Sequence, residues 1–315
     1  MLLNHALSRS GLLFSVATLA LVVAAGCGDS DSDSPGGGGG GTGTTGPTTS
    51  SGNSTNTGSS ASSTTGTGVP GCDDPATDPG AVNDVPATTV QASARDENDT
   101  GIANTPFQLC GFDLCLPGDT SAIGSVTFSN SQPALDRPVF KPADSLTFGK
   151  IGYPYTQQSP SPLIGHFPSM TDSGTEMVPG QTVSAAGASL VVPAGYSIDT
   201  LIYDEPDKQT FRAGTLPTDL VGDATGDPAF VMLYALGPFD TILCPPAALT
   251  LDNYADLPAD SQVELWAQVL NVEEFFAGYG EWVKLDDGVV SSDGATISTV
   301  NGIPALLTIA IKPAE

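Results

Sequence analysis

The stretch SQVELWAQVL, residues 261–270, alternates between apolar and polar side chains along most of its length. Successive side chains of an extended chain point to opposite faces, so a period of two predicts a β-strand with one buried face. The expected buried face consists of Val263, Leu265, Ala267 and Val269. The opposite face carries Gln262, Glu264, Trp266 and Gln268. For Trp266 we weigh a binding role against burial in a second core under a covering loop, and favour the second.

Further short apolar runs lie on both sides of this stretch. Three follow it, GEWVKL (280–285), ATISTV (295–300) and PALLTIAIK (304–312), and each has the length of one strand. Before it, residues 229–253 contain two or three strands that are interrupted at Gly237-Pro238 and Pro245-Pro246. Short strands separated by turn residues are typical of antiparallel sandwiches. We therefore predict one β-sandwich over residues 181–315.

A second group of short strands comes earlier in the chain. It comprises TTVQASARD (88–96), the strand pair PFQLCGFDLCL (106–116) and GSVTFSN (124–130). No window of eleven or more residues in this region has the 3.6-residue period of a helix. We predict a smaller antiparallel sandwich over residues 71–157, followed by a Ser/Pro-rich connector at 158–180. The expected fold class is all-β, with two antiparallel β-sandwich domains.

The N-terminal residues have the form of a secretory signal peptide. Arg9 precedes a twelve-residue run from Leu12 to Val23, and Ala24, Ala25 and Gly26 lead to Cys27. Such a run is too short for a membrane-spanning helix. It resembles the lipobox of bacterial lipoproteins, with Ala24 where leucine is usual. The resemblance implies a signal peptide at 1–26 and lipidation of Cys27 with palmitate or similar chains. An ordinary signal with Cys27 in a disulfide is the alternative.

Two or more acyl chains hold a protein durably on a membrane. The resemblance therefore implies a membrane partner through the lipid on Cys27 and a place in the bacterial cell envelope. Gly28 follows the cysteine, where an aspartate commonly retains enterobacterial lipoproteins at the inner membrane. We accordingly expect the outer membrane rather than the inner one.

Residues 27–70 are of low complexity. They consist almost entirely of Gly, Ser, Thr, Asp, Asn and Pro, with six glycines at 36–41. Such a segment buries too little apolar surface to offset its ordering entropy, so it is predicted to be a disordered linker. A Gly/Ser coil of this length has a root-mean-square reach of roughly 35 Å.

The charge balance bears on the class of partner. The chain has 35 acidic residues against 9 Lys and Arg, a formal net charge of −26. Nucleic acids and anionic lipids need clustered positive charge, so we expect no nucleic-acid partner. The expected partner is an unidentified protein or glycan.

Four cysteines follow Cys27, namely Cys72, Cys110, Cys115 and Cys244. An even number in an exported chain predicts two disulfides, for which three connectivities are possible. The CGFDLC spacing favours a bridge between Cys110 and Cys115 around a tight loop. Cys72 and Cys244 are then left to form the other bridge.

The region from about 85 to 157 resembles the carboxypeptidase regulatory-like fold. The matching positions are Pro106, Phe107, Thr120, Gly124, Val126 and Phe128. The resemblance implies a structural or binding module and not a peptidase.

The region from about 182 to 312 resembles the ZU-type sandwich of ankyrins and netrin receptors. The matching positions are Pro193, Gly195, Pro238, Phe239, Pro246, Leu249, Trp282 and Leu285. The chain departs from that family near its end, where NGIPALLTIAIKP replaces the histidine-phenylalanine-serine close. The autoproteolytic chemistry of some relatives is therefore not carried over.

The sequence offers little for catalysis. His166 is the one histidine after the signal peptide, and it has no nucleophile elbow beside it. Four glutamates lie close in sequence, Glu264, Glu273, Glu274 and Glu281, but a glycosidase needs two carboxyls at a fixed separation in a cleft. We expect no catalytic residue.

Calcium is the cofactor that we keep open. The acidic turns DATGD, DDG and SSDG contain oxygen ligands of the kind that Ca²⁺ prefers. Their carboxylates are Asp223, Asp227, Asp286, Asp287 and Asp293. Asp-Gly is also common hairpin-turn chemistry, and none of these turns is a complete calcium loop.

Together these features favour a cell-envelope lipoprotein that presents non-catalytic β-sandwich modules for binding or for envelope assembly. The alternative is a carbohydrate-active or other hydrolase that uses a pair of carboxylates. The hydrolase can be told apart from the binding module, because it needs a cleft that contains a carboxyl group of raised pKa.

Overall fold

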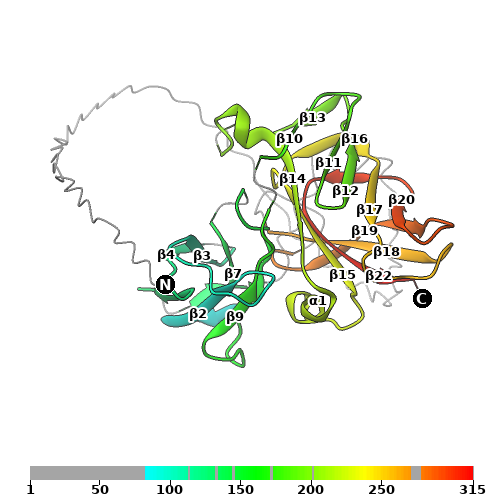
Figure 1. Ribbon diagram of the computed structural model, residues 1–315. Coiled ribbons are helices and arrows are strands. Elements are labelled where there is room, and N and C mark those ends of the chain that lie inside the picture. The colour runs from blue at the N-terminus through cyan, green and yellow to red at the C-terminus, as the bar shows by residue number, and fades with distance from the viewer. Residues whose placement is uncertain are drawn as a thin grey trace, which may run out of the picture. The chain divides into compact units, whose positions relative to one another are not determined.

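The computed structural model describes residues 82–314, except 113, 132–133, 144–145, 171–172, 201 and 271–277. The predicted signal peptide, Cys27 and the linker lie outside the described residues. Within them, the chain forms mostly strands together with a single α-helix, and the predicted all-β class is confirmed (Figure 1).

The largest sheet has ten strands. Their order across the sheet is β10 (Thr175–Glu176), β14 (Thr210–Thr215), β15 (Met232–Gly237), β22 (Thr308–Pro313), β18 (Gln262–Gln268), β19 (Trp282–Val290), β20 (Thr296–Thr299), β17 (Leu249–Asp252), β12 (Ala188–Val191) and β11 (Thr182–Ala185). All its pairs are antiparallel. The sheet curves until its two edges nearly meet, and the Thr175 hydroxyl of β10 donates to the Ser184 carbonyl of β11 at 3.1 Å.

The core of this sheet is made by the residues that the alternating pattern selects. Val263 and Leu265 of β18 are buried there beside Ile309 and Ile311 of β22. On β22 the intervening residue Ala310 is buried as well, but in a different cluster on the other face. Sheets that are covered on both faces have nearly continuous apolar strands. This explains why β15 and β22 read as apolar runs, whereas β18 alternates.

A smaller sandwich lies before this sheet in the chain. One of its layers is β5 (Ser125–Ser129), β2 (Thr89–Arg95) and β9 (Leu163–His166), and the other is β4 (Cys115–Asp119), β3 (Pro106–Cys110), β7 (Val139–Pro142) and β8 (Tyr153–Pro154). Phe128 from the first layer packs on Phe140 from the second, with 5.9 Å between the ring centroids. Three strands complete a further small sheet, β13 (Gly195–Ser197), β16 (Ile242–Ala247) and β21 (Ile303–Ala305), and β1 (Asp84–Pro86) pairs with β6 (Ala134–Asp136).

Several elements fall where no such element is predicted, and β10 is one of them because it lies in the predicted connector. β9 belongs to the predicted connector, yet it pairs in parallel with β2, as the adjacent arrows in Figure 1 show. β9 has only four residues and follows a Ser/Pro-rich stretch, so its alternation is too short to detect. The helix α1 (Thr218–Thr225) ends at Gly226, whose φ of 71° is left-handed, and eight residues give too short a period for an eleven-residue window. A short 3₁₀ helix, η1 (Pro206–Gln209), precedes β14.

The described residues all belong to one compact unit. The core of the smaller sandwich extends onto β15, β22 and α1, because Phe107 and Phe140 share one apolar cluster with Leu233, Ala310 and Val221. Polar contacts also join the two regions. The side-chain amide of Gln268 donates to the Gly152 carbonyl at 2.7 Å and accepts from the Gly152 N–H at 2.8 Å.

The predicted bridge between Cys110 and Cys115 is confirmed, and it joins β3 to β4 where the two strands pair. Cys244 also takes part in a disulfide. Cys72, its predicted partner, lies outside the described residues.

Candidate functional site

The two tryptophans of the chain meet on one face of the ten-stranded sheet. Trp266 of β18 and Trp282 of β19 both pack on Phe230, with ring centroids 6.0 and 5.8 Å away. We call these three residues the Phe230 cluster. Phe230 follows α1 and is only 5 % exposed, and both tryptophans are half-buried. The segment that carries Phe230 therefore covers Trp266, in agreement with burial of Trp266 in a second core.

Ion pairs surround Trp266. The carboxylate of Glu264 accepts from Lys284 at 2.9 Å and from the Trp266 indole N–H at 3.0 Å, and Lys312 lies 3.5 Å away. The Lys312 ammonium is also 4.6 Å from the centroid of the Trp266 ring, which is a cation–π distance. The hydrogen bond from Lys284, and then that from Trp266, lower the pKa of Glu264.

A cavity of about 610 Å³ lies beside α1, and we call it the α1 cavity. Asp219 and Asp223, four residues apart on α1, contribute its carboxylates, while Pro228 and Phe230 contribute apolar surface. Residues four apart lie on the same face of a helix. Carboxylates beside an aromatic ring suit a neutral polar or a cationic ligand. Of these residues, only Asp223 was singled out by the sequence, because α1 itself is too short to predict.

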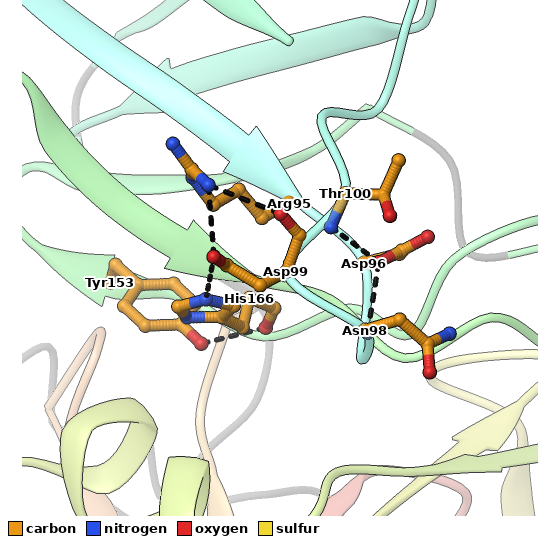
Figure 2. Close-up of polar contacts among 7 residues, drawn as sticks. All are labelled: Arg95, Asp96, Asn98, Asp99, Thr100, Tyr153 and His166. Carbon is orange, nitrogen blue, oxygen red and sulfur yellow. Dashed lines mark hydrogen bonds and ion pairs between the residues drawn. The ribbon is translucent and has the colours of Figure 1, made fainter.

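His166 lies at the end of β9, beside a loop that follows β2. Its imidazole Nε2 lies 3.2 Å from Asp99 Oδ1, which also accepts from Arg95 at 2.9 Å (Figure 2). The hydrogen bond from His166, and then that from Arg95, lower the pKa of Asp99. The loop is fixed by Asp96, whose Oδ1 accepts from the backbone N–H groups of Asn98 and Thr100.

No serine nucleophile is paired with this histidine among the described residues. Ser169, the nearest serine in sequence, donates its hydroxyl to Glu97 at 3.0 Å. The backbone carbonyl of His166 accepts from the buried Tyr153 hydroxyl at 2.6 Å (Figure 2). Burial raises the pKa of Tyr153. The arrangement is that of a loop held by charged hydrogen bonds.

The five carboxylates considered for calcium are dispersed. Asp286 is 5 % exposed and accepts from the backbone of Asn301 at 2.8 Å and of Gly302 at 2.9 Å, so it fixes that turn. Asp287 pairs with Lys284 at 2.8 Å. Both therefore have structural roles.

The other three lie in separate turns or on α1. Asp293 accepts from the Ser291 hydroxyl at 2.6 Å, and Asp227 accepts from the Ala229 N–H at 2.9 Å. Asp223 lines the α1 cavity. Across the part of the chain that the structure describes, no group of three or more His, Cys, Asp and Glu residues is arranged to hold a metal ion.

The glutamates considered for hydrolysis are separated as well. Glu264 belongs to the ion pairs around Trp266, whereas Glu281 accepts from the Gly278 N–H at 3.3 Å. Glu273 and Glu274 lie outside the described residues.

Among the described helices, none is long and apolar enough to cross a membrane. Comparison of the chain with protein-family models, with curated proteins and with solved structures found no match.

Proposed function

We propose that the chain is a cell-envelope lipoprotein, anchored through acylated Cys27, that uses its β-sheets to bind a partner rather than to catalyse a reaction. The anchor rests on the lipobox resemblance, and the outer membrane is the proposed location. The partner is a protein or a glycan.

One observation carries the binding role. Wherever the pKa of a carboxyl group departs from its ordinary value in the described part of the chain, it is lowered. These groups are Asp99, Asp136, Asp204, Glu264 and Asp293. A general acid for hydrolysis needs a raised pKa, which burial or a like charge would produce. These five carboxylates are instead held by lysines, arginines, a histidine, an indole N–H, a serine hydroxyl and backbone N–H groups, which supports a binding scaffold.

The anchor is tested by metabolic labelling with an alkyne analogue of palmitate. The wild-type chain should incorporate the label and the Cys27→Ser variant should not. The matched control is Cys244→Ser, which also removes one cysteine but should keep the label, because Cys244 is in a disulfide. Label retained in Cys27→Ser would overturn the lipid anchor.

The binding role is tested by photo-crosslinking in intact cells. A photoreactive amino acid in place of Asp223, at the α1 cavity, should give one dominant adduct. The same substitution at Asp293, in an exposed turn, is the control and should give none. Turnover of glycoside or ester substrates by the purified chain, abolished by substituting carboxylates, would overturn the proposal in favour of the hydrolase.

A further inference from the structure

The sequence contains one asparagine that is followed directly by glycine, Asn301-Gly302. In such a pair, the backbone nitrogen of the glycine can attack the side-chain carbonyl carbon of the asparagine, because glycine has no side chain to hinder the approach. The attack forms a cyclic imide and releases the side-chain nitrogen as ammonia. Water then opens the ring to aspartate or isoaspartate. The net reaction exchanges an amide for a carboxyl group, and nothing is oxidised or reduced.

This pair lies in the turn between β20 and β21. Asn301 is exposed, so water reaches it, and Gly302 has a left-handed φ of 99°. A Cβ atom at Gly302 would lie 2.7 Å from the carbonyl oxygen of Ala247, which is too close for any other residue. The fold therefore requires glycine at this position, and burial does not shield the asparagine before it.

A single carboxylate holds both reacting groups. Asp286 Oδ2 accepts from the Gly302 N–H, the attacking group, at 2.9 Å. Asp286 Oδ1 accepts from Asn301 Nδ2, the leaving group, also at 2.9 Å. The backbone N–H of Asn301 donates to Oδ2 as well, at 2.8 Å. Asp286 thus binds the nucleophile and the leaving group in their unreacted forms.

Asp286 is itself placed by the large sheet. It is 5 % exposed, and its partner across the sheet is Leu265 of β18. The register shifts directly beside it, because Trp266 pairs with Lys284 and Leu285 is left over in β19. Bulges of this kind redirect side chains. The carboxylate that meets the turn therefore belongs to a fixed strand and not to the turn itself.

This carboxylate opposes the cyclisation in two ways. The glycine nitrogen attacks after it has lost its proton, and the charge of Asp286 at 2.9 Å disfavours a second negative charge there. The hydrogen bonds to a charged acceptor also have to break before the nitrogen can approach the side chain of Asn301. Both effects slow the reaction in the folded chain.

We propose that Asn301 is a site of spontaneous deamidation that Asp286 keeps unreactive in the folded chain. Conversion of Asn301 to aspartate replaces the Nδ2 donor by a second carboxylate beside Asp286, and their repulsion weakens the turn. The proposal depends neither on the lipid anchor nor on a binding partner.

The test follows deamidation of residue 301 in the purified full chain at neutral pH by peptide-mapping mass spectrometry. The reference is the synthetic peptide STVNGIPA (298–305), which lacks Asp286. Residue 301 should react about 10-fold or more slowly in the chain than in the peptide, because charge-assisted hydrogen bonds have to break first. Asp286→Asn should raise the rate at residue 301 by about 10-fold or more, and fragmentation spectra locate the change at that residue.

The matched control is Asp227→Asn. Asp227 is also a turn carboxylate, and it accepts from the Ala229 N–H at 2.9 Å. The asparagine introduced there precedes Pro228, which has no backbone N–H, so it adds no reactive pair. This variant should keep the wild-type rate at residue 301. Circular dichroism and tryptophan fluorescence establish that both variants are folded.

Equal rates in the wild-type chain and in the peptide would overturn the inference without any variant. A folded Asp286→Asn chain that reacts at the wild-type rate would overturn it as well. The effect on the turn is measured by comparing Asn301→Asp with Asn301→Ser, because both lose Nδ2 but only the first adds a charge. Asn301→Asp should have the lower Tm at neutral pH, and equal Tm values would show that deamidation does not weaken the turn.

Discussion

The Phe230 cluster and the surroundings of Tyr279 both bury aromatic rings, but they differ in how their polar atoms are paired. In the cluster, the Trp266 indole is paired with Glu264, and Glu264 is paired with two lysines. Near Tyr279, by contrast, the Tyr279 hydroxyl and one carboxylate oxygen of Asp240 are buried without a hydrogen-bond partner. A buried polar atom without a partner loses its hydration without compensation. The Phe230 cluster should therefore stabilise the fold more than the surroundings of Tyr279 do.

The largest expected effect comes from removing the centre of the cluster. Phe230→Ala should lower the free energy of unfolding by about 3–5 kcal/mol, because a ring that is only 5 % exposed leaves a cavity beside Trp266 and Trp282. Chemical denaturation followed by tryptophan fluorescence measures it. Val289→Ala, at a 41 % exposed position of β19, is the control and should change stability by less than about 0.5 kcal/mol. A loss below about 1 kcal/mol for Phe230→Ala would mean that the cluster is surface and available for binding.

The next effect concerns a residue that joins the large sheet to the smaller sandwich. Gln268 follows Trp266 on the same face of β18 and is fully buried, with both of its amide atoms bonded to Gly152. Gln268→Ala leaves the Gly152 N–H and carbonyl without partners and should cost about 2–3 kcal/mol. Thermal and urea unfolding measure it, with the exposed Gln262→Ala on the same strand as control. Equal stabilities of the two variants would show that this contact does not hold the smaller sandwich to the large sheet.

Periodicity predicted the strands well but not the sites. Val263 and Leu265 lie in the core as expected, because alternation directly encodes which face is buried. The same pattern placed Gln268 among solvent-facing residues, and it is buried because a segment more than a hundred positions earlier packs on it. Short elements such as β9 and α1 have too few residues to show a period.

The candidate sites depend on contacts of the same long-range kind. Asp286 and the Asn301-Gly302 pair come from two separate segments, and nothing in the sequence near either one signals their contact. The acidic turns, by contrast, are visible in the sequence. Their carboxylates serve those turns, as Asp293 does for Ser291 and Ala295, so a local pattern indicates a turn more strongly than a metal site.

The smallest expected effect is the pH dependence of the ion pairs beside Trp266. The folded chain lowers the pKa of Glu264 below its ordinary value of 4.5, chiefly through Lys284 and then Trp266. A carboxyl with a lowered pKa binds its proton more weakly in the folded state, so its contribution to stability is present above pH 4.5. That contribution is lost as the pH falls through the folded pKa. Tm measured from pH 7 to pH 3 should therefore fall less steeply below pH 4.5 in Glu264→Gln than in the wild type.

The matched variant for this experiment is Glu176→Gln, an exposed position on β10, which should follow the wild-type curve. Lys284 and Lys312 lose their common partner in Glu264→Gln, so that variant should also start from a slightly lower Tm at pH 7. Surface ion pairs contribute little each, and salt screens them, so the difference should shrink at high ionic strength. If the two glutamine variants had the same pH profile, the ion pairs of Glu264 would not stabilise the fold, and polar pairing would not be what sets the Phe230 cluster apart.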